Sequence, residues 1–438
     1  MSADPGLFAP EGSSARAMAD ALAWLWRLGP VRAEPGPGAV AIGGLDDAAG
    51  CSALVRAGRV SGAVIFAERP GDAAGPVPPR ALRSGVARLP GGSVRGDFLV
   101  FDRADGLVRS TLGVHAVRDG SLLMLGASSA SWGRLELAWV LDTVARFLSA
   151  TLGRPLVRLP PIGCLRWDDV PGTAYEQLDG AAHSDRRQRA RVARVLRACR
   201  RRRASVNLAV PVSGLSAGRE TPIDRVWPET VATIARGAAS GAFEIVAHGT
   251  VHFDTGARAE GRLDPREFAR LDAAEAGRRI DASVGWLREH VGAPETFVAP
   301  AWGYSEGTLE AARRRGMLTW QPAAPGPLLD ATGAIHETLD TGLPGLTGVD
   351  YRPLAQLARA GLPPVLVIHG TLLDYRVMNL RRPRDAPVAA RLAMRRDLLR
   401  LLAVRGVRWV RAGELVERLR DHAGTDARSG LNPSRVTR

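Results

Sequence analysis

Short apolar runs alternate with amphipathic stretches along most of the chain. An apolar run of about four to eight residues is typical of a buried strand, and apolar positions three or four apart are typical of a helix. In the first third of the sequence, helical spacing is clearest at residues 133–152. The expected strands of this region are residues 39–43, 62–67, 98–101 and 122–125. This mixture predicts a small α/β domain.

The pattern becomes more regular after residues 153–163, which contain three prolines. Proline holds the backbone extended and cannot continue a helix, so we place a domain boundary in this segment. The expected strands beyond it are residues 164–167, 205–210, 243–247, 296–299, 317–320, 364–368 and 407–410. Helices between most of these strands predict a deformed (β/α)7-type barrel, preceded by the smaller α/β domain.

The helices of the second region have recognisable boundaries. Residues 187–203 and 224–240 are each expected to form one helix. The next helix takes Asp264 as its N-cap, with Pro265 in the first turn and Gly292 just past the end, because these residue types are favoured at those places. Further helices are expected at residues 305–316 and 388–404, and a last one ends near residue 419.

Composition sets the limits of the folded parts. Residues 1–20 are rich in Ala, Gly, Pro and Ser and are expected to be poorly ordered. The small domain then occupies residues 21–155, and the barrel occupies residues 162–420. The polar residues 421–438 are expected to form a loose tail.

Ionisable residues follow three of the expected barrel strands. Asp168 and Asp169 come after the first strand, His248 and His252 after the third, and His369 after the sixth. The carboxyl ends of the strands meet at one face of a β/α barrel, where such proteins bind their ligands. We therefore expect these side chains to lie close together.

The spacing of the two histidines suits a shared metal ion. Histidines four positions apart lie on one face of a helical turn, so both imidazoles can reach one ion, and Asp169 completes a three-ligand set. Zinc is the ion we expect, and water bound to it ionises near pH ~7. Asp168 points away from Asp169 if the backbone is extended, so it can accept a proton while His369 protonates the leaving group.

Each of these residues also has an ordinary structural interpretation. Aspartates are common in polar turns, and the histidines could be unrelated surface or core residues. Their joint occurrence at strand ends favours the metal site.

In order and spacing these residues resemble the polysaccharide deacetylases, the NodB-homology proteins of carbohydrate esterase family four. The first family motif, of the type T-F-D-D, matches residues 165–169 (LRWDD), and the second, H-S/T-x-x-H, matches residues 248–252 (HGTVH). The fifth, a strand ending in L-x-I-H, matches residues 366–369 (LVIH). The resemblance covers residues 162–420 and implies a deformed β/α barrel. It also implies one role each for the residues of these motifs: general base Asp168, metal ligands Asp169, His248 and His252, and general acid His369.

The third family motif is matched only in part, by residues 297–303 (FVAPAWG). Val298 and Ala299 occupy the candidate places of an Arg that orients the base in the family. Trp302 stands where Tyr is usual, and its backbone N–H could face an oxyanion. Trp320 is expected to line the substrate pocket. Both tryptophans could instead serve in core packing alone.

The charge of the chain changes this picture little. There are 59 basic and 45 acidic residues, and the formal net charge is +14. All the basic residues are Arg, which is typical of a GC-rich genome, so we expect no nucleic-acid partner. Ten of them lie within residues 186–203, and this run is expected to be a solvated helix face. The basic excess mildly favours an acidic substrate.

The cysteines and the apolar content bear on the compartment. Cys51, Cys164 and Cys199 show no C-x-x-C spacing, which argues against a disulfide framework and a thiolate metal site. We find neither a secretory signal nor an apolar stretch of the ~18 residues that span a membrane. We therefore expect a cytoplasmic protein without membrane partners, and its oligomeric state stays open.

The smaller domain vaguely resembles the class I glutamine amidotransferase-like or flavodoxin-like folds. Cys51 does not stand in a strand-to-helix elbow between glycines, so a scaffolding or substrate-shaping role is favoured over nucleophilic chemistry. For the whole chain we expect a metal-dependent hydrolase that removes an acyl group, acetyl foremost, from an amide nitrogen of a sugar or sugar conjugate. Two alternatives stay open: a non-catalytic carbohydrate- or metal-binding barrel, and a C–N hydrolase of a non-sugar amide.

Overall fold

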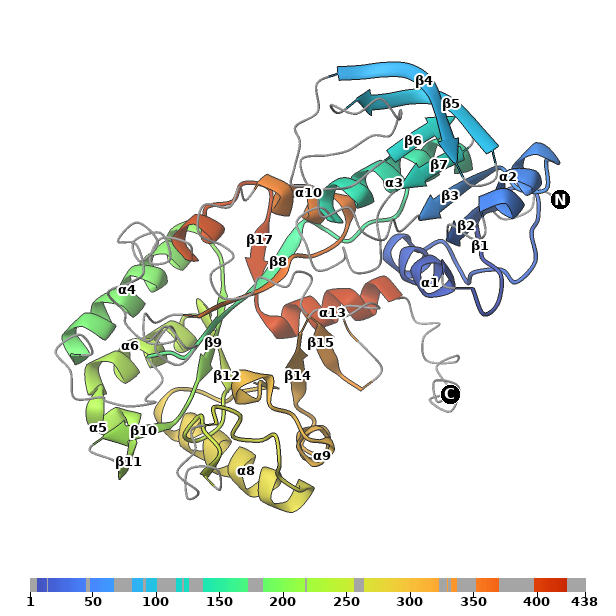
Figure 1. The fold of residues 1–438 in the computed structure, drawn as a ribbon. Coiled ribbons are helices and arrows are strands. Elements are labelled where there is room, and N and C mark those ends of the chain that lie inside the picture. Colours follow the sequence, from blue (N-terminus) through green and yellow to red (C-terminus); the bar gives the residue numbers. More distant parts are fainter. Residues whose placement is uncertain are drawn as a thin grey trace. The chain divides into compact units, whose positions relative to one another are not determined.

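The protein forms two compact units, which we describe separately (Figure 1). The first unit comprises Met1–Pro161, Ala324–Pro327 and Pro353–Leu362, and the second comprises Ile162–Ala323, Leu328–Arg352 and Pro363–Arg438. The computed structural model describes residues 6–13, 15–44, 48–66, 81–89, 92–100, 116–119, 122–125, 137–171, 184–216, 219–255, 264–322, 329, 332–336, 352–369 and 398–423.

The first unit is built on a seven-stranded sheet in the order β1-β2-β3-β7-β6-β5-β4. Its strands are β1 (Leu7–Phe8), β2 (Val40–Gly44), β3 (Gly62–Phe66), β4 (Ala81–Leu89), β5 (Gly92–Val100), β6 (Ala116–Asp119) and β7 (Leu122–Leu125). Its helices are α1 (Ala15–Trp26), α2 (Ala48–Arg56), α3 (Leu137–Leu152) and α10 (Arg352–Ala360). The pairs β1–β2, β2–β3 and β3–β7 are parallel. The pairs β7–β6, β6–β5 and β5–β4 are antiparallel. The sheet is therefore mixed.

The described part of the chain begins at residue 6, within the segment 1–20 that we expected to be poorly ordered. Leu7 and Phe8 form β1, which pairs in parallel with β2, and both side chains are buried. Helix α1 begins soon after, at Ala15. Burial of the apolar residues at the start of the chain outweighs its loop-like composition.

The second unit is a nearly closed barrel of parallel strands, as predicted. The strand order is β15-β14-β13-β12-β9-β8-β16, and β17 pairs the beginning of β8. These strands are β8 (Ile162–Asp168), β9 (Val206–Val210), β12 (Phe243–Ala247), β13 (Thr296–Phe297), β14 (Leu318–Gln321), β15 (Ala334–His336), β16 (Val365–His369) and β17 (Arg408–Val410). Because β17 occupies the start of β8, β9 pairs β8 only at Arg166 and Trp167, which deforms the barrel. Strand β15 was not among the predicted strands, and neither was the hairpin of β10 (Ser213–Ser216) and β11 (Arg219–Pro222).

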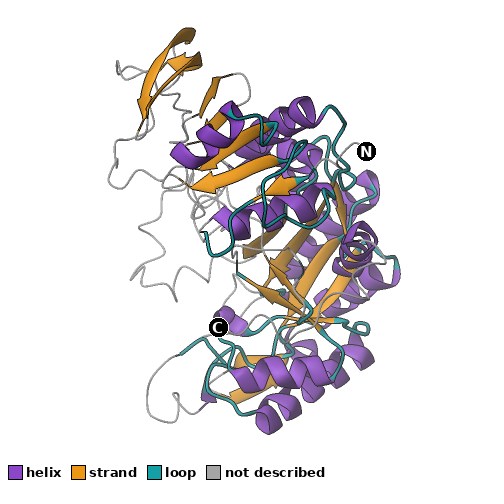
Figure 2. Cartoon of the chain, turned by 90° about the vertical axis from the view of Figure 1, so that its right-hand side faces the viewer, coloured by secondary structure: helices purple, strands orange, loops and turns teal. Residues whose placement is uncertain are grey.

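Helices flank the strands of this unit (Figure 2). They are α4 (Asp185–Arg202), α5 (Ile223–Val226), α6 (Pro228–Ala239), α8 (Ala273–His290), α9 (Glu306–Arg314) and α13 (Ala412–Ala423). Every residue of β8 and β9 is buried, as expected for parallel strands covered on both faces. Among the described residues no helix is long and apolar enough to cross a membrane.

Two predicted helices differ from those observed. The helix expected at residues 224–240 is broken at Trp227, which has φ −131° and ψ 58°, because a residue before proline is disfavoured in helical conformation. The helix expected from Asp264 begins instead at Ala273, and its N-cap is Asp272, whose side chain accepts a hydrogen bond from the Glu275 N–H. The expected helix at 388–404 lies largely outside the described residues, as does most of the expected tail.

Candidate metal centre

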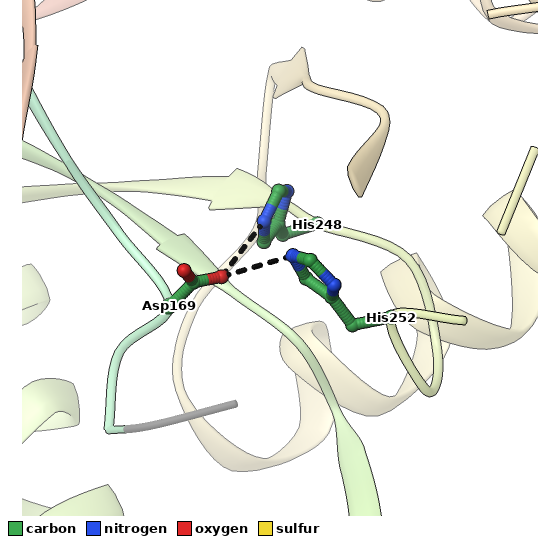
Figure 3. A group of neighbouring side chains, drawn as sticks. All are labelled: Asp169, His248 and His252. Atoms are coloured by element: carbon green, nitrogen blue, oxygen red, sulfur yellow. Dashed lines mark hydrogen bonds and ion pairs between the residues drawn. The ribbon is translucent and has the colours of Figure 1, made fainter. Parts of the chain in front are cut away.

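Three predicted side chains, Asp169, His248 and His252, meet beside the carboxyl ends of two barrel strands (Figure 3). Asp169 directly follows β8, and the histidines lie on the segment that follows β12. All three residues are buried, and one potential ligand atom from each lies within 4.8 Å of the others. The barrel topology therefore brings together residues that are about eighty positions apart in sequence.

A single carboxylate oxygen faces both imidazoles. Asp169 Oδ1 lies 3.2 Å from His248 Nε2 and 3.1 Å from His252 Nε2. The two imidazole rings are 4.9 Å apart between centroids, at an angle of 73°. In Figure 3 both dashed lines run to this oxygen. Three ligand atoms converging from separate segments can hold one divalent ion.

The surroundings of His248 fit this role. Its Nδ1 lies 3.0 Å from the Val298 carbonyl oxygen, which can only accept a hydrogen bond. Nδ1 therefore carries the proton, and in the neutral ring the Nε2 lone pair faces the centre of the group. Metal-binding histidines in proteins are usually oriented by a bond of this kind.

The charge state of Asp169 also fits. Burial alone would raise the pKa of this carboxyl, but the neighbouring His252 and His248 imidazoles outweigh it and hold the pKa well below its usual value. Burial likewise opposes charge on His248, whereas its hydrogen bond to Asp169 and the nearby Asp168 raise the pKa of His248. Asp169 is therefore an anion at neutral pH, which is the form that binds a cation.

The segment from His248 to His252 is not the helical turn that we expected. Gly249 and His252 have left-handed φ values of 73° and 61°, so the backbone bends instead of coiling. Glu267, which is 1% exposed, lies beneath this bend. Its carboxylate accepts hydrogen bonds from the backbone N–H groups of Thr250, Val251 and His252 at 2.9–3.1 Å.

Glu267 replaces helical hydrogen bonds in shaping this segment. The Thr250 hydroxyl donates to the same carboxylate at 2.6 Å. A side chain at position 249 would collide with Glu267, which explains why glycine stands there. The sequence did not reveal Glu267, because D-P-R-E at residues 264–267 is typical of the first turn of a helix.

The two adjacent aspartates have different partners, and their separation does not arise from the extended backbone that we expected. Asp169 has a left-handed φ of 60° and is not extended. Asp168 faces Arg166 on the same strand: Nε and one terminal nitrogen of Arg166 donate to Oδ1 and Oδ2 of Asp168 at 2.6 and 2.8 Å. Residues two apart on a strand share a face, so this pair could have been inferred from the sequence.

Arg166 contacts both tryptophans that the sequence singled out. Its guanidinium carbon lies 4.5 Å from the centroid of the Trp302 ring and 4.8 Å from that of the Trp320 ring. The Trp302 backbone N–H, which we expected to face an oxyanion, donates instead to the Ala299 carbonyl. Direct contact of either indole with substrate stays a prediction.

His369 ends β16 and is the register partner of Asp168 on the neighbouring strand β8. Its backbone therefore lies beside the backbone of the expected general base. The side chain of His369 lies outside the described residues, so its role as general acid stays a prediction.

Left-handed residues gather around this site. Six described residues other than glycine have positive φ. Four of them adjoin the groups above: Asp169, His252, Ala301 and Trp302. Such conformations cost free energy and concentrate at functional sites, which is a second reason to place the chemistry here.

No model of a known protein family matches the chain, and no curated protein matches it significantly. Similar solved structures include a family 4 acetyl xylan esterase from Clostridium thermocellum in complex with a cobalt ion. The two sequences are 16% identical, the match covers 58% of this chain and 90% of that chain, and the TM-score is 0.32. A peptidoglycan deacetylase from Bacillus subtilis has 14% identity, with 61% and 96% covered and a TM-score of 0.33. A CE4 family pseudoenzyme from Bacillus anthracis has 11% identity, with 59% and 66% covered and a TM-score of 0.34.

At these identities and TM-scores the likeness by itself says nothing about function. The glutamine amidotransferase-like resemblance of the first unit finds no support in the comparisons. The described residues define a deformed β/α barrel with a buried Asp-His-His group that can hold a divalent metal ion.

Proposed function

We propose that the protein is a metal-dependent hydrolase that removes an acyl group, most simply acetyl, from an amide nitrogen of a sugar or sugar conjugate. The observation that carries this proposal is the convergence of Asp169, His248 and His252 next to Asp168, a second carboxylate with a different partner. A metal site that includes a separate proton acceptor is the minimum that metal-assisted hydrolysis needs.

Asp169, His248 and His252 would hold the ion, and zinc suits this set of two imidazoles and one carboxylate. When bound, the metal supplies Lewis acidity to the acyl carbonyl and to the attacking water. Asp168 accepts the proton of that water. Both of its oxygens accept hydrogen bonds from Arg166, which hold the carboxylate in place. His369, beside Asp168 in the strand register, delivers a proton to the departing amine nitrogen.

The substrate class rests on chemistry and charge. Protonation of the leaving group by His369 matters most for an amide, because an amine is a poor leaving group unless it is protonated. The formal net charge of +14 would raise the local concentration of an acidic or phosphorylated sugar conjugate. Such a small conjugate fits the cytoplasmic location expected from the sequence.

The test measures acetate release by the purified full chain with zinc. Substrates are chitooligosaccharides and N-acetylglucosamine conjugates, including phosphorylated ones. Asp168→Asn and His369→Ala should abolish turnover while the metal content stays near one ion per chain. Asp169→Asn should lose both metal and turnover.

Other outcomes identify the alternatives. Bound metal without acetate from any substrate would refute the proposal and favour a binding barrel. Turnover confined to cyclic or non-sugar amides would instead assign the site to another C–N hydrolase.

A further inference from the structure

We propose that Arg166 is the positioning residue of the site: held against Trp302 and Trp320, it fixes the Asp168 carboxylate in the orientation needed for proton transfer. This inference rests on the proposed function, because it takes Asp168 to be the proton acceptor. No substrate contact is assigned to Arg166 itself, which is fully buried.

The contact between Arg166 and Asp168 constrains orientation as well as charge. Two parallel N–H···O bonds of 2.6 and 2.8 Å join the guanidinium fork to both carboxylate oxygens. A bidentate pair fixes the plane of the carboxylate, which a single point charge cannot do. Asp168 is 3% exposed, so water competes little for these bonds. The carboxylate cannot turn without breaking at least one of them.

The guanidinium is itself held in place. It lies over the rings of Trp302 and Trp320, at distances typical of cation–π contacts. Trp302 reaches this position through two consecutive left-handed residues, Ala301 at φ 49° and Trp302 at φ 57°. Neither residue is a glycine, so this left-handed conformation costs free energy. It places the Trp302 ring against Arg166.

Tyr304 ties the two tryptophan-bearing segments together. Its hydroxyl donates to the Trp320 carbonyl at 2.5 Å and accepts from the Ala299 N–H at 3.1 Å. The turn that carries Trp302 and the strand that carries Trp320 are thus joined by one side chain. Tyr304 therefore joins the backbones of the two segments whose indole rings lie against Arg166, and Arg166 in turn holds Asp168.

This arrangement accounts for the unusual third motif. Val298 and Ala299 stand at the places where the resembling family has its base-orienting Arg. Here a guanidinium reaches the same kind of carboxylate from β8 itself, two residues before it. The absence of Arg at 298 and 299 therefore ceases to favour a non-catalytic protein.

The variant Arg166→Lys distinguishes a positioning residue from a purely structural ion pair, because only the loss of a positioning residue should lower kcat. Lysine keeps the buried positive charge but loses the planar fork. We expect kcat to fall about 100-fold, as for a misplacement of roughly 1 Å, with KM and the metal content close to wild type. The matched control is Arg315→Lys, because Arg315 forms a bidentate pair with Asp281 that joins the end of α9 to α8. This control should keep the wild-type kcat.

Chemical rescue gives a second measurement. Guanidinium ion at non-denaturing concentration should restore part of the kcat of Arg166→Ala and none of that of Asp168→Asn. An Arg166→Lys variant with wild-type kcat would overturn the proposal, and so would a folded, metal-bound Arg166→Ala that guanidinium leaves unchanged. If Arg166→Ala does not fold, Arg166→Lys decides alone.

The failure of the proposed function would be visible separately, as an absence of acetate release by the wild type. In that case the crystal structures of the wild type and Arg166→Lys, both with zinc, test the positioning role without any activity. A rotated Asp168 carboxylate in the variant supports the proposal, and an unchanged carboxylate overturns it.

Discussion

Asp168 and Asp169 are consecutive in the chain, yet their carboxylates have different surroundings. Asp168 is the last residue of β8 and shares a strand face with Arg166, whereas Asp169 turns into the left-handed region and faces two imidazoles. One residue of backbone therefore separates a carboxylate that meets a guanidinium from one that can meet a metal. The end of β8 at Asp168 therefore decides which of the two carboxylates faces the imidazoles.

Glu267 should control metal affinity, although it is not itself a ligand. Its carboxylate only accepts hydrogen bonds, and the three backbone N–H groups of the bend require an acceptor. Glu267→Gln replaces one acceptor oxygen with a donor and should weaken zinc binding about 10- to 100-fold, as for other residues that orient ligands. Isothermal titration calorimetry measures this change.

The control for Glu267 is Glu310→Gln. Glu310 pairs with Arg314 on α9, and neither residue pairs with Glu267. This control should keep the wild-type zinc affinity. Equal affinities for both variants would show that the bend holds its shape without Glu267.

At the scale of elements, the ligands directly follow β8 and β12, so the packing of helices on these strands should influence the position of the site. Helix α6 covers β12, and Gly237 of α6 lies against the ring of Phe243, the first residue of β12. No space remains between helix and strand for a further carbon. This close contact sets the distance between the two elements.

Two glycines on helices should therefore respond oppositely to alanine. Gly237→Ala forces a methyl group into the Phe243 ring and should destabilise the protein by about 1–3 kcal/mol. Gly285→Ala on α8 meets no atom within 4 Å and should stabilise by about 0.5–1 kcal/mol, the usual gain of alanine over glycine in a helix. Urea unfolding of both variants measures the difference. A stabilising Gly237→Ala would mean that α6 can move away from β12.

The amino end of β12 meets the start of α13 at Glu244. The Gly413 N–H of α13 donates to this carboxylate at 3.3 Å. Burial, which is the largest cause, and the neighbouring Glu295 raise the pKa of Glu244 from 4.5 to about 7. The native state therefore binds more protons than the unfolded state between these two values, so the free energy of unfolding falls as pH rises from 4.5 to 7.

Glu244→Gln should abolish this pH dependence. Glutamine cannot ionise, so the variant should gain about 2–3 kcal/mol relative to the wild type between pH 4.5 and pH 8. The measurement is urea unfolding of both proteins at these pH values. If the difference in the free energy of unfolding between the two proteins did not change with pH, the ionised Glu244 carboxylate would be solvated in the native state, by water or after a shift of structure.

On the scale of the whole molecule, neither unit is a continuous stretch of sequence. Helix α10 belongs to the first unit, where the Trp26 indole N–H donates to the Ala360 carbonyl at 2.8 Å. The strands before and after it in the chain, β15 and β16, belong to the second unit. A fragment that ends at Pro161 would therefore lack one helix of its own unit.

Metal binding should stabilise the molecule, because its ligands come from two strands that separate on unfolding. Zinc at 100 times its dissociation constant should add about 2.7 kcal/mol, which corresponds to a rise in Tm of roughly 5–10 °C. Removal of the ion with EDTA should reverse the rise. Asp169→Asn should show no rise, and an equal rise in this variant would place the binding elsewhere. Differential scanning calorimetry gives both values.

The sequence by itself determined most of the barrel strands and the three residues of the candidate metal centre. Strand periodicity and apolar runs depend on local burial, which the order of residues records directly. Asp169, His248 and His252 were predictable as a group because each follows an apolar run, and parallel strands end at a common face. The misplaced start of α8 shows the limit, since D-P-R-E at 264–267 has the local preferences of a helix start.

Only the tertiary structure decided how those residues are oriented. The left-handed backbone at Asp169 and His252 opposes local preference, and contacts distant in sequence compensate for it. Glu267 reaches His252 across fifteen positions, and Arg166 meets tryptophans more than a hundred positions away. Local patterns cannot encode such pairings, because their free energy arises only once the barrel has closed around them.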